Sequence, residues 1–133
     1  MDIDNMKRIN DEYTHSFGDR ALKIVANAIK DSIREREDVA VRFGGDEMLI
    51  LLPNSHEGSA KDVIKRVRKR LSKISFPEEI KLSAGIALWE PGDDMEKVIN
   101  LADRRMYDYK FKKAKKERKF KKNPLFAFIH YSI

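Results

Sequence analysis

The chain has 133 residues, 41% of them hydrophobic and 38% charged, which suits one domain with a modest core. Cysteine is absent and the three histidines are scattered, which excludes disulfides, thiolate chemistry and a zinc site built on His and Cys. No apolar run is long enough to span a bilayer and no signal-peptide pattern opens the chain, so we expect a cytoplasmic protein without a membrane segment.

The formal net charge of +6 comes from one segment, residues 110–122, which holds nine Lys or Arg residues against one Glu. The rest of the chain carries 19 basic and 21 acidic residues, so its charges nearly balance. A basic segment attracts phosphates of any origin, but a solvated helix end or linker explains it more simply. We therefore do not expect nucleic acid as a partner.

In chain order, the first elements are short. Residues 2–4 (Asp-Ile-Asp) have the alternation of a strand end, and residues 5–13 have the periodicity of a short helix. We expect a break over residues 14–18, after which Asp19 caps a second helix whose apolar positions run from Leu22 to Ile33.

Residues 39–53 follow as two short apolar runs separated by Gly44 and Gly45, which predicts a β-hairpin with a glycine turn. Asp46 and Glu47 come directly after the glycines. Because the glycines have no side chains to block approach, a cation bridging these carboxylates to an anionic ligand fits the turn. A solvated acidic turn explains the tetrapeptide alone equally well.

The remaining pattern predicts helices alternating with strands. Gly85, in the middle of an apolar run, indicates close packing or a bulge. The expected elements are a helix over 60–74, a buried strand over 81–89, a turn over 90–94, a helix over 95–109 and a strand over 124–133. The order predicts an α/β (α+β) domain with one mixed, mainly antiparallel sheet flanked by helices.

Carboxylates stand at two places that such a sheet can bring together: the end of the first strand, with Asp2 and Asp4, and the hairpin with Asp46 and Glu47. Acidic residues on adjacent strands are a usual way to hold Mg²⁺ or Mn²⁺ for phosphoryl transfer. The N–H groups that open the helix after Asp4 are suited to phosphate, and lysines add positive charge.

These motifs together resemble the GGDEF family of diguanylate cyclases, which condense two GTP molecules into cyclic di-GMP and release pyrophosphate. The resemblance covers residues 2–110 and implies a palm-type, nucleotide-cyclase-like fold. The segments that carry it are Asp2-Ile-Asp-Asn-Met-Lys-Arg-Ile-Asn-Asp11, His15 with Gly18-Asp19, Arg42-Phe-Gly-Gly-Asp-Glu47, Ser83-Ala-Gly-Ile86, and Ala102-Asp103 with Tyr107 and Lys110.

The resemblance implies roles for individual residues. Asp2 and Asp46 would hold the metal with the carbonyl of Ile3, and Glu47 would bind metal or activate the ribose 3′-hydroxyl. Asn10 and Asp19 would contact guanine, whose N–H donors suit a carboxylate; helix ending and capping are the alternative roles. Phosphate contacts would come from Asn5, Met6, Lys7 and Lys110.

Several positions depart from the family. The family's Arg-x-x-Asp product-inhibition motif has Glu35 at the arginine and Asp38 at the aspartate, so we expect no inhibitory site. Ala114 stands where the family has a closing phosphate-binding arginine. Lys112, Lys113 and Lys115 are the nearby candidates to substitute for it, but a lysine does not give the bidentate geometry of arginine. Two milder differences are Met48 in place of Phe and Thr14 in place of Gly.

The resemblance to the GGDEF family also predicts how the chain is divided. We expect a GGDEF core over residues 1–110, a basic linker or helix end over 111–123, and a sheet-completing strand over 124–133. The family's opening helix and most of its first strand are missing from the sequence. Because residues 126–133 read straight into Asp2-Ile-Asp4 like that strand, we hypothesise that they fill its place; an ordinary last strand at an edge is the alternative.

The sequence thus predicts a cyclase that uses GTP and Mg²⁺ (or Mn²⁺), releases cyclic di-GMP and works as a homodimer, with one GTP in each domain. A degenerate domain that binds GTP, cyclic di-GMP or a partner protein without catalysis is the alternative. A cyclase making another cyclic nucleotide is a third interpretation, which Asn10 and Asp19 disfavour.

Overall fold

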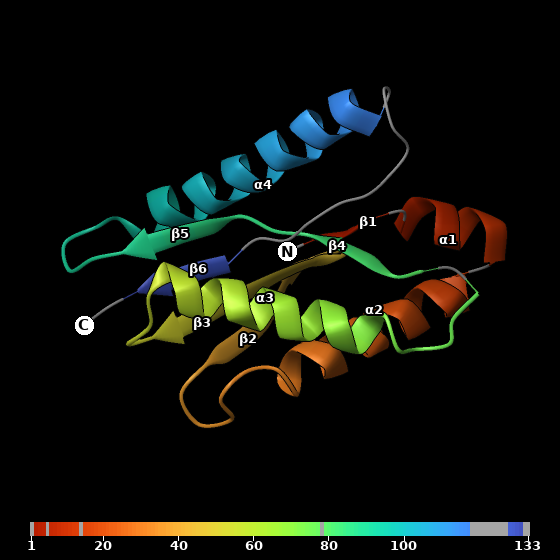
Figure 1. Cartoon of the computed structure of the whole chain (residues 1–133), viewed down its shortest axis with the longest axis horizontal. Helices are drawn as coiled ribbons and strands as arrows, with labels where there is room; N and C mark the ends of the chain where they lie inside the picture. Colours follow the sequence, from red (N-terminus) through yellow and green to blue (C-terminus); the bar gives the residue numbers. More distant parts are fainter. Residues whose placement is uncertain (1, 5, 14, 78, 118–127, 132–133) are drawn as a thin grey trace.

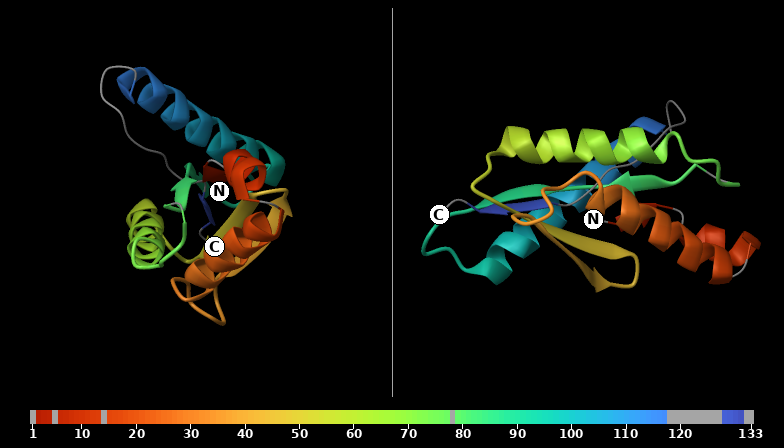
Figure 2. Two further views of the ribbon diagram at one scale, coloured as in Figure 1. Left: turned by 90° about the vertical axis from the view of Figure 1, so that its right-hand side faces the viewer. Right: turned by 90° about the horizontal axis from the view of Figure 1, so that it is seen from below.

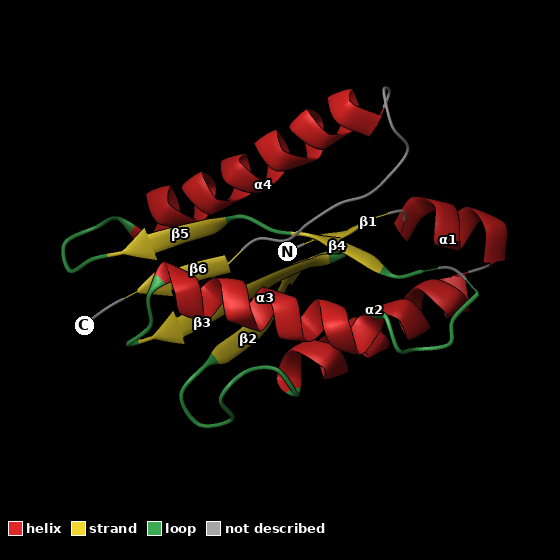
Figure 3. Ribbon diagram, viewed as in Figure 1, coloured by secondary structure: helices red, strands yellow, loops and turns green. Residues whose placement is uncertain are grey.

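Within the described residues (2–4, 6–13, 15–77, 79–117 and 128–131), the computed structural model has six strands in one sheet, flanked by helices (Figure 1; Figure 3). In chain order the elements are β1 (Asp2–Asp4), α1 (Met6–Tyr13), α2 (His15–Lys30), β2 (Val39–Gly44), β3 (Glu47–Pro53), α3 (Glu57–Leu71), β4 (Lys81–Ser83), β5 (Ile86–Trp89), α4 (Met95–Glu117) and β6 (Phe128–Tyr131). No helix in this described part is long and apolar enough to cross a membrane.

The sheet is mixed. Its strand order is β4-β1-β3-β6-β5, with β2 also paired to β3. Strand β1 runs antiparallel to β3 and β4, and β2 antiparallel to β3, whereas β6 runs parallel to both β3 and β5. This arrangement confirms the predicted α+β class with a mixed, mainly antiparallel sheet.

Helices cover both faces of the sheet (Figure 2). Helices α1, α2 and α3 share one core with β1, β3 and β4, built around buried residues such as Ile50, Val25 and Val67. Helix α4 packs on the other face, where Ala87, Val98 and Ala102 form a smaller cluster. Strand β3 serves both layers because its residues alternate in burial, as expected for a strand between two covered faces.

Helix α2 begins earlier than its sequence predicts. The expected break over residues 14–18 is wrong, because α2 starts at His15, and Asp19 lies inside the helix rather than at its cap. Packing explains the extension: Phe17 lies 5.6 Å from Tyr13 and 6.0 Å from Phe76, measured between ring centroids. These aromatic contacts compensate for the low helix propensity of Gly18.

The expected strand over residues 81–89 is divided into β4 and β5 by Ala84 and Gly85. The predicted close packing at Gly85 is confirmed. An added Cβ there would stand 2.0 Å from the Ala102 carbonyl oxygen and 2.6 Å from the Met106 nitrogen, both in the backbone of α4. Gly85 therefore allows α4 to approach the sheet more closely than any side chain would permit.

Strand β6 occupies an interior place in the sheet, between β3 and β5. Its position differs from the edge place of the alternative interpretation. Its neighbours are those that the main hypothesis requires, because β6 lies between β3 and β5 just as β1 lies between β3 and β4. Its direction is the opposite of a first strand that runs on into Asp2, because β6 is parallel to β3 and β1 is antiparallel to it. The replacement of the first strand by residues 126–133 stays a prediction. The expected strand ends, 124–127 and 132–133, lie outside the described residues.

Helix α4 extends beyond Lys110 to Glu117, so the first part of the basic segment is helical. Residues 118–123, the rest of the expected linker, lie outside the described residues. The division into a core, a basic segment and a final strand stays a prediction.

Candidate functional site

The candidate site begins where β1 meets its two neighbours. Asp2 lies directly opposite Glu47 of β3 and Ser83 of β4. Residues directly opposite each other on antiparallel strands project from the same face of the sheet. Asp2 and Glu47 therefore share the face covered by α4, while the next residue, Ile3, is buried with the α1–α3 core.

The hairpin between β2 and β3 presents the second acidic pair. Gly45 has φ +42°, so the predicted need for a glycine in the left-handed region holds at this position. The register shifts between Arg42 and Gly44, which places a β-bulge at Phe43 just before the turn. Arg42 steadies the turn, because its Nε donates a hydrogen bond to the Gly45 carbonyl at 2.8 Å.

Asp46 lies next to Asp2, and Lys110 joins them from α4. Partial burial raises the pKa of the Asp46 carboxyl above its ordinary value, and a hydrogen bond with Asp2 and the negative charge of Asp2 raise that pKa further. The Lys110 ammonium lowers it, and also makes an ion pair with the Asp2 carboxylate. Two carboxylates and one ammonium are thus held together by elements far apart in the sequence.

A groove of about 500 Å³ adjoins this cluster. It lies between α1, α2 and the hairpin turn, with Asp46 at one side. Besides Asp46, its lining includes four residues predicted to contact the nucleotide, Met6, Lys7, Asn10 and Asp19, together with Asp11, His15, Gly18, Leu22, Arg42 and Gly45. The helical position of Asp19 thus still places it in the groove, although it does not cap α2.

Asn10 is set against α2 at a glycine. An added Cβ at Gly18 would stand 2.0 Å from Asn10 Oδ1 and 3.1 Å from Met6 Cε. Gly18 is buried in α2 and does not have a positive φ, so the glycine is required for its small size and not for its backbone conformation. It leaves the room in which the Asn10 amide lies.

The structure brings most of the predicted site residues to one region. Asp2, Glu47, Asp46 and Lys110 cluster at the strand ends, and the predicted guanine and phosphate residues of α1 and α2 line the adjoining groove. Asn5, also predicted to contact phosphate, lies outside the described residues. The sequence assigned no role to Arg42, His15 or Asp11, although each stands within a segment that carries the family resemblance.

The chemistry of these donors is that of hard oxygen ligands. Two carboxylates whose mutual repulsion raises a pKa make a local negative charge that a small divalent cation would neutralise. Among the described residues, no three His, Cys, Asp or Glu side chains gather around one point, so a cation would need further oxygen ligands from backbone or substrate. With these additional oxygen ligands, the residues present fit Mg²⁺ or Mn²⁺.

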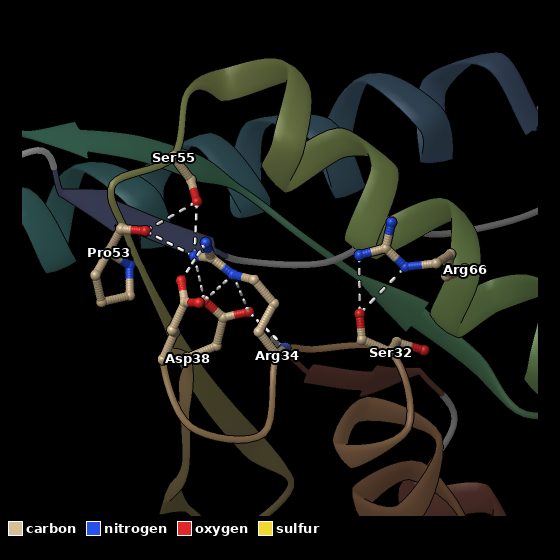
Figure 4. A network of polar contacts seen from close by, with 7 residues as sticks. Ser32, Arg34, Asp38, Pro53, Ser55 and Arg66 are labelled. Carbon is tan, nitrogen blue, oxygen red and sulfur yellow. Dashed lines mark hydrogen bonds and ion pairs between the residues drawn. The ribbon is translucent and has the colours of Figure 1, made fainter.

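Asp38, the one remaining residue of the product-inhibition motif, is engaged in a structural network (Figure 4). Its side chain is only 2% exposed and accepts hydrogen bonds from the backbone nitrogen and guanidinium of Arg34. Arg34 also donates to the Pro53 carbonyl and the Ser55 hydroxyl, and so ties the loop before the hairpin to the loop after it. The absence of an inhibitory site stays a prediction, which this engagement of Asp38 supports.

A mixed, mainly antiparallel sheet flanked by helices, with acidic residues at a strand end and a hairpin beside a groove of about 500 Å³, is the architecture of a palm-type, nucleotide-cyclase-like domain. The sequence profile of the family described as "Diguanylate cyclase, GGDEF domain" matches residues 1–118, and the chain belongs to this GGDEF family.

Similar proteins agree with the family. The chain is 39% identical over 107 residues to the probable diguanylate cyclase DgcJ of Escherichia coli, covering 80% of this chain and 21% of that protein. It is 36% identical over 112 residues to the diguanylate cyclase DgcP of Pseudomonas aeruginosa, covering 80% and 16%. The chain therefore spans about a fifth of the length of these curated relatives.

Solved structures share the fold. The active GGEEF domain of a diguanylate cyclase from Vibrio cholerae aligns with a TM-score of 0.71 and 29% identity, over 84% of this chain and 73% of that one. The GGDEF domain of DgcB from Caulobacter crescentus, solved in complex with c-di-GMP, aligns with a TM-score of 0.67 over 95% and 73%. Its 20% identity supports the fold alone.

Proposed function

We propose that this chain is the catalytic domain of a diguanylate cyclase, which condenses two GTP molecules into cyclic di-GMP with Mg²⁺ (or Mn²⁺). The observation that carries the proposal is the convergence of Asp2, Asp46 and Lys110 beside a groove lined by Asn10 and Asp19. Its relatives named as diguanylate cyclases support the same reaction. A cytoplasmic location stays a prediction.

In this proposal, Asp2 and Asp46 hold the metal ion together with the Ile3 carbonyl. When bound, the metal would neutralise charge on the phosphates and polarise the bond to the leaving pyrophosphate. Lys7 and Lys110 bind the non-bridging phosphate oxygens, and the first N–H groups of α1 face the same charge. The rise in the pKa of Asp46 is reversed by a neighbouring cation, so metal binding favours the ionised pair.

The groove residues select the base. The Asp19 carboxylate accepts hydrogen bonds from the N1–H and N2–H₂ groups of guanine, and the Asn10 amide offers one donor and one acceptor. Adenine presents a different pattern on the same edge. Both side chains line the groove of about 500 Å³, a volume suitable for a nucleotide.

The reaction needs two such domains. The 3′-hydroxyl oxygen of one GTP forms a bond to the α-phosphorus of the GTP in the partner domain, the bond to pyrophosphate breaks, and the hydroxyl proton is transferred to a base. Glu47, exposed at the start of β3 and opposite Asp2, is our candidate for that base. Because each domain holds one GTP, a homodimer makes both new bonds.

A second candidate function is nucleotide or partner binding without catalysis. One sequence feature favours it: Ala114 replaces the phosphate-binding arginine of the family. The retained acidic residues favour the enzyme. The two functions differ in whether bound GTP is converted.

Product analysis separates the two candidates. We expect the purified chain with GTP and Mg²⁺ to release cyclic di-GMP and pyrophosphate, identified by mass, and the Asp46→Ala, Glu47→Ala double variant to release neither. The Asp62→Ala variant, which changes an exposed carboxylate on α3, is the matched control. GTP binding without product, at concentrations where a dimer is shown to form, would reject the enzyme and favour the second candidate.

A further inference from the structure

The packing of α4 against the sheet sets where Lys110 begins its reach. Ala102 and Met106, on the preceding turns of α4, are 2% and 6% exposed. Their backbone meets the sheet at Gly85, where any side chain would collide with them. Since Lys110 follows Met106 by about one helical turn, it lies on the same face of α4. The packing of α4 therefore places the Lys110 side chain beside β1.

The group that Lys110 reaches is a carboxylate predicted to bind metal. Its ammonium is paired with Asp2, and the two side chains are only 30% and 19% exposed. The same ammonium also acts electrostatically on Asp46, whose carboxyl group interacts with that of Asp2. One positive charge thus faces two acidic groups whose ionised forms repel each other. In a partly desolvated cluster, such a charge is a substantial part of what holds the carboxylates together.

We propose that Lys110 is an internal counter-ion of the metal site: it pairs with Asp2 when no cation is bound, and moves to the GTP phosphates when metal and nucleotide bind together. This inference rests on the proposed function, which assigns both the metal and the phosphates. It adds a positioning role in the free protein to the phosphate contact. The lysine side chain is long and flexible enough to make this exchange without movement of α4.

The exchange links metal binding to nucleotide binding. A metal ion that arrives alone competes with Lys110 for Asp2, and must displace the ammonium from that carboxylate against the repulsion of two like charges. A metal ion that arrives with GTP brings phosphate oxygens that accept the ammonium. By thermodynamic linkage, each ligand then raises the affinity for the other. The free domain would be protected against occupation by divalent cations alone.

Metal affinity measured without nucleotide tests the proposal directly. We would titrate the purified chain with Mn²⁺, following free Mn²⁺ by electron paramagnetic resonance, and compare Lys110→Met with the wild type. Met keeps the apolar stem and removes the charge. We expect Lys110→Met to bind Mn²⁺ about five- to tenfold more tightly, and to bind GTP more weakly. Lys97→Met, at an exposed position near the start of the same helix, is expected to change neither.

The outcomes separate the inference from the function it rests on. Equal or weaker Mn²⁺ binding by a folded Lys110→Met chain, when the wild type does bind, overturns the counter-ion role and leaves the proposed metal site intact. Absence of Mn²⁺ binding in every variant rejects the metal site and the inference together. Circular dichroism checks the fold, and Lys110→Gln replaces Lys110→Met in the same titration if the latter does not fold.

Discussion

At the scale of single residues, folding and the proposed metal binding favour different protonation states of Asp46. Burial and the neighbouring Asp2 raise its pKa, so the ionised form is disfavoured in the free protein, whereas metal binding requires that form. The ionised carboxyl therefore lowers the stability of the fold, and the proposed cation would offset this cost by neutralising the charge.

The raised pKa of Asp46 predicts the pH dependence of stability. Since the folded state binds this proton more tightly than the unfolded state, stability falls as pH rises from the ordinary carboxyl value through the raised pKa. We expect Asp46→Asn to be more stable than the wild type at pH 7 without metal, by less than about 1 kcal/mol because the group is partly solvated.

Thermal unfolding in a metal-free buffer between pH 4 and pH 8 measures this difference. The gain of Asp46→Asn should shrink toward the acidic end of this range, because protonation removes the charge of the wild-type carboxyl. Mg²⁺ added together with GTP should raise the melting temperature of the wild type by more than that of the variant. A variant that is less stable than the wild type at pH 7 without metal would contradict the account.

Asp38 shows the reverse case, an acidic residue that stabilises the fold. Its buried carboxylate accepts from the backbone and guanidinium of Arg34, so removal leaves these donors without their acceptor. We expect Asp38→Ala to lower the free energy of unfolding by about 1–3 kcal/mol, measured by urea denaturation. Glu37→Ala removes an exposed partner of the same Arg34 and should cost below about 0.5 kcal/mol.

At the scale of elements, α4 connects the two parts of the site. It packs across β5 through a contact that only glycine allows, and its next turn presents Lys110 to β1. The sequence indicated the close packing at Gly85, because a glycine inside an apolar strand pattern is typical of a bulge or of a close backbone approach. It did not indicate which helix approaches, since that depends on how the chain crosses the sheet.

Replacing Gly85 by Ala tests this contact. The added methyl group would overlap the α4 backbone, which cannot rotate away as a side chain can. We expect Gly85→Ala to destabilise the domain by about 1–3 kcal/mol or more in urea denaturation, and to weaken GTP binding through displacement of Lys110. Unchanged stability and unchanged GTP affinity would show that α4 is not held at this point.

At the scale of the whole molecule, the proposed reaction places one GTP in the groove of each of two domains and joins the two nucleotides. Cyclic di-GMP formation should therefore depend on protein concentration. We expect the product formed per protein molecule to rise as the concentration passes through the dimer dissociation constant, and then to level off. Mass photometry or sedimentation on the same samples gives the dimer fraction; a rate per molecule that is constant across this range would contradict the requirement for two domains.

The sequence alone determined the local features: the glycine turn at Gly45, the α+β order of elements, and the acidic residues at Asp2 and Asp46 that carry the family resemblance. These depend on periodicity, turn chemistry and residue type, which neighbours in the chain specify. The start of α2, by contrast, was mispredicted, because the aromatic packing of Phe17 against Phe76 outweighs a local helix breaker. Only the tertiary structure decided the direction of β6, the contact of α4 with Gly85 and the pairing of Lys110 with Asp2. Each of these joins segments distant in the sequence, and such contacts are chosen by the packing of the whole sheet rather than by any local pattern.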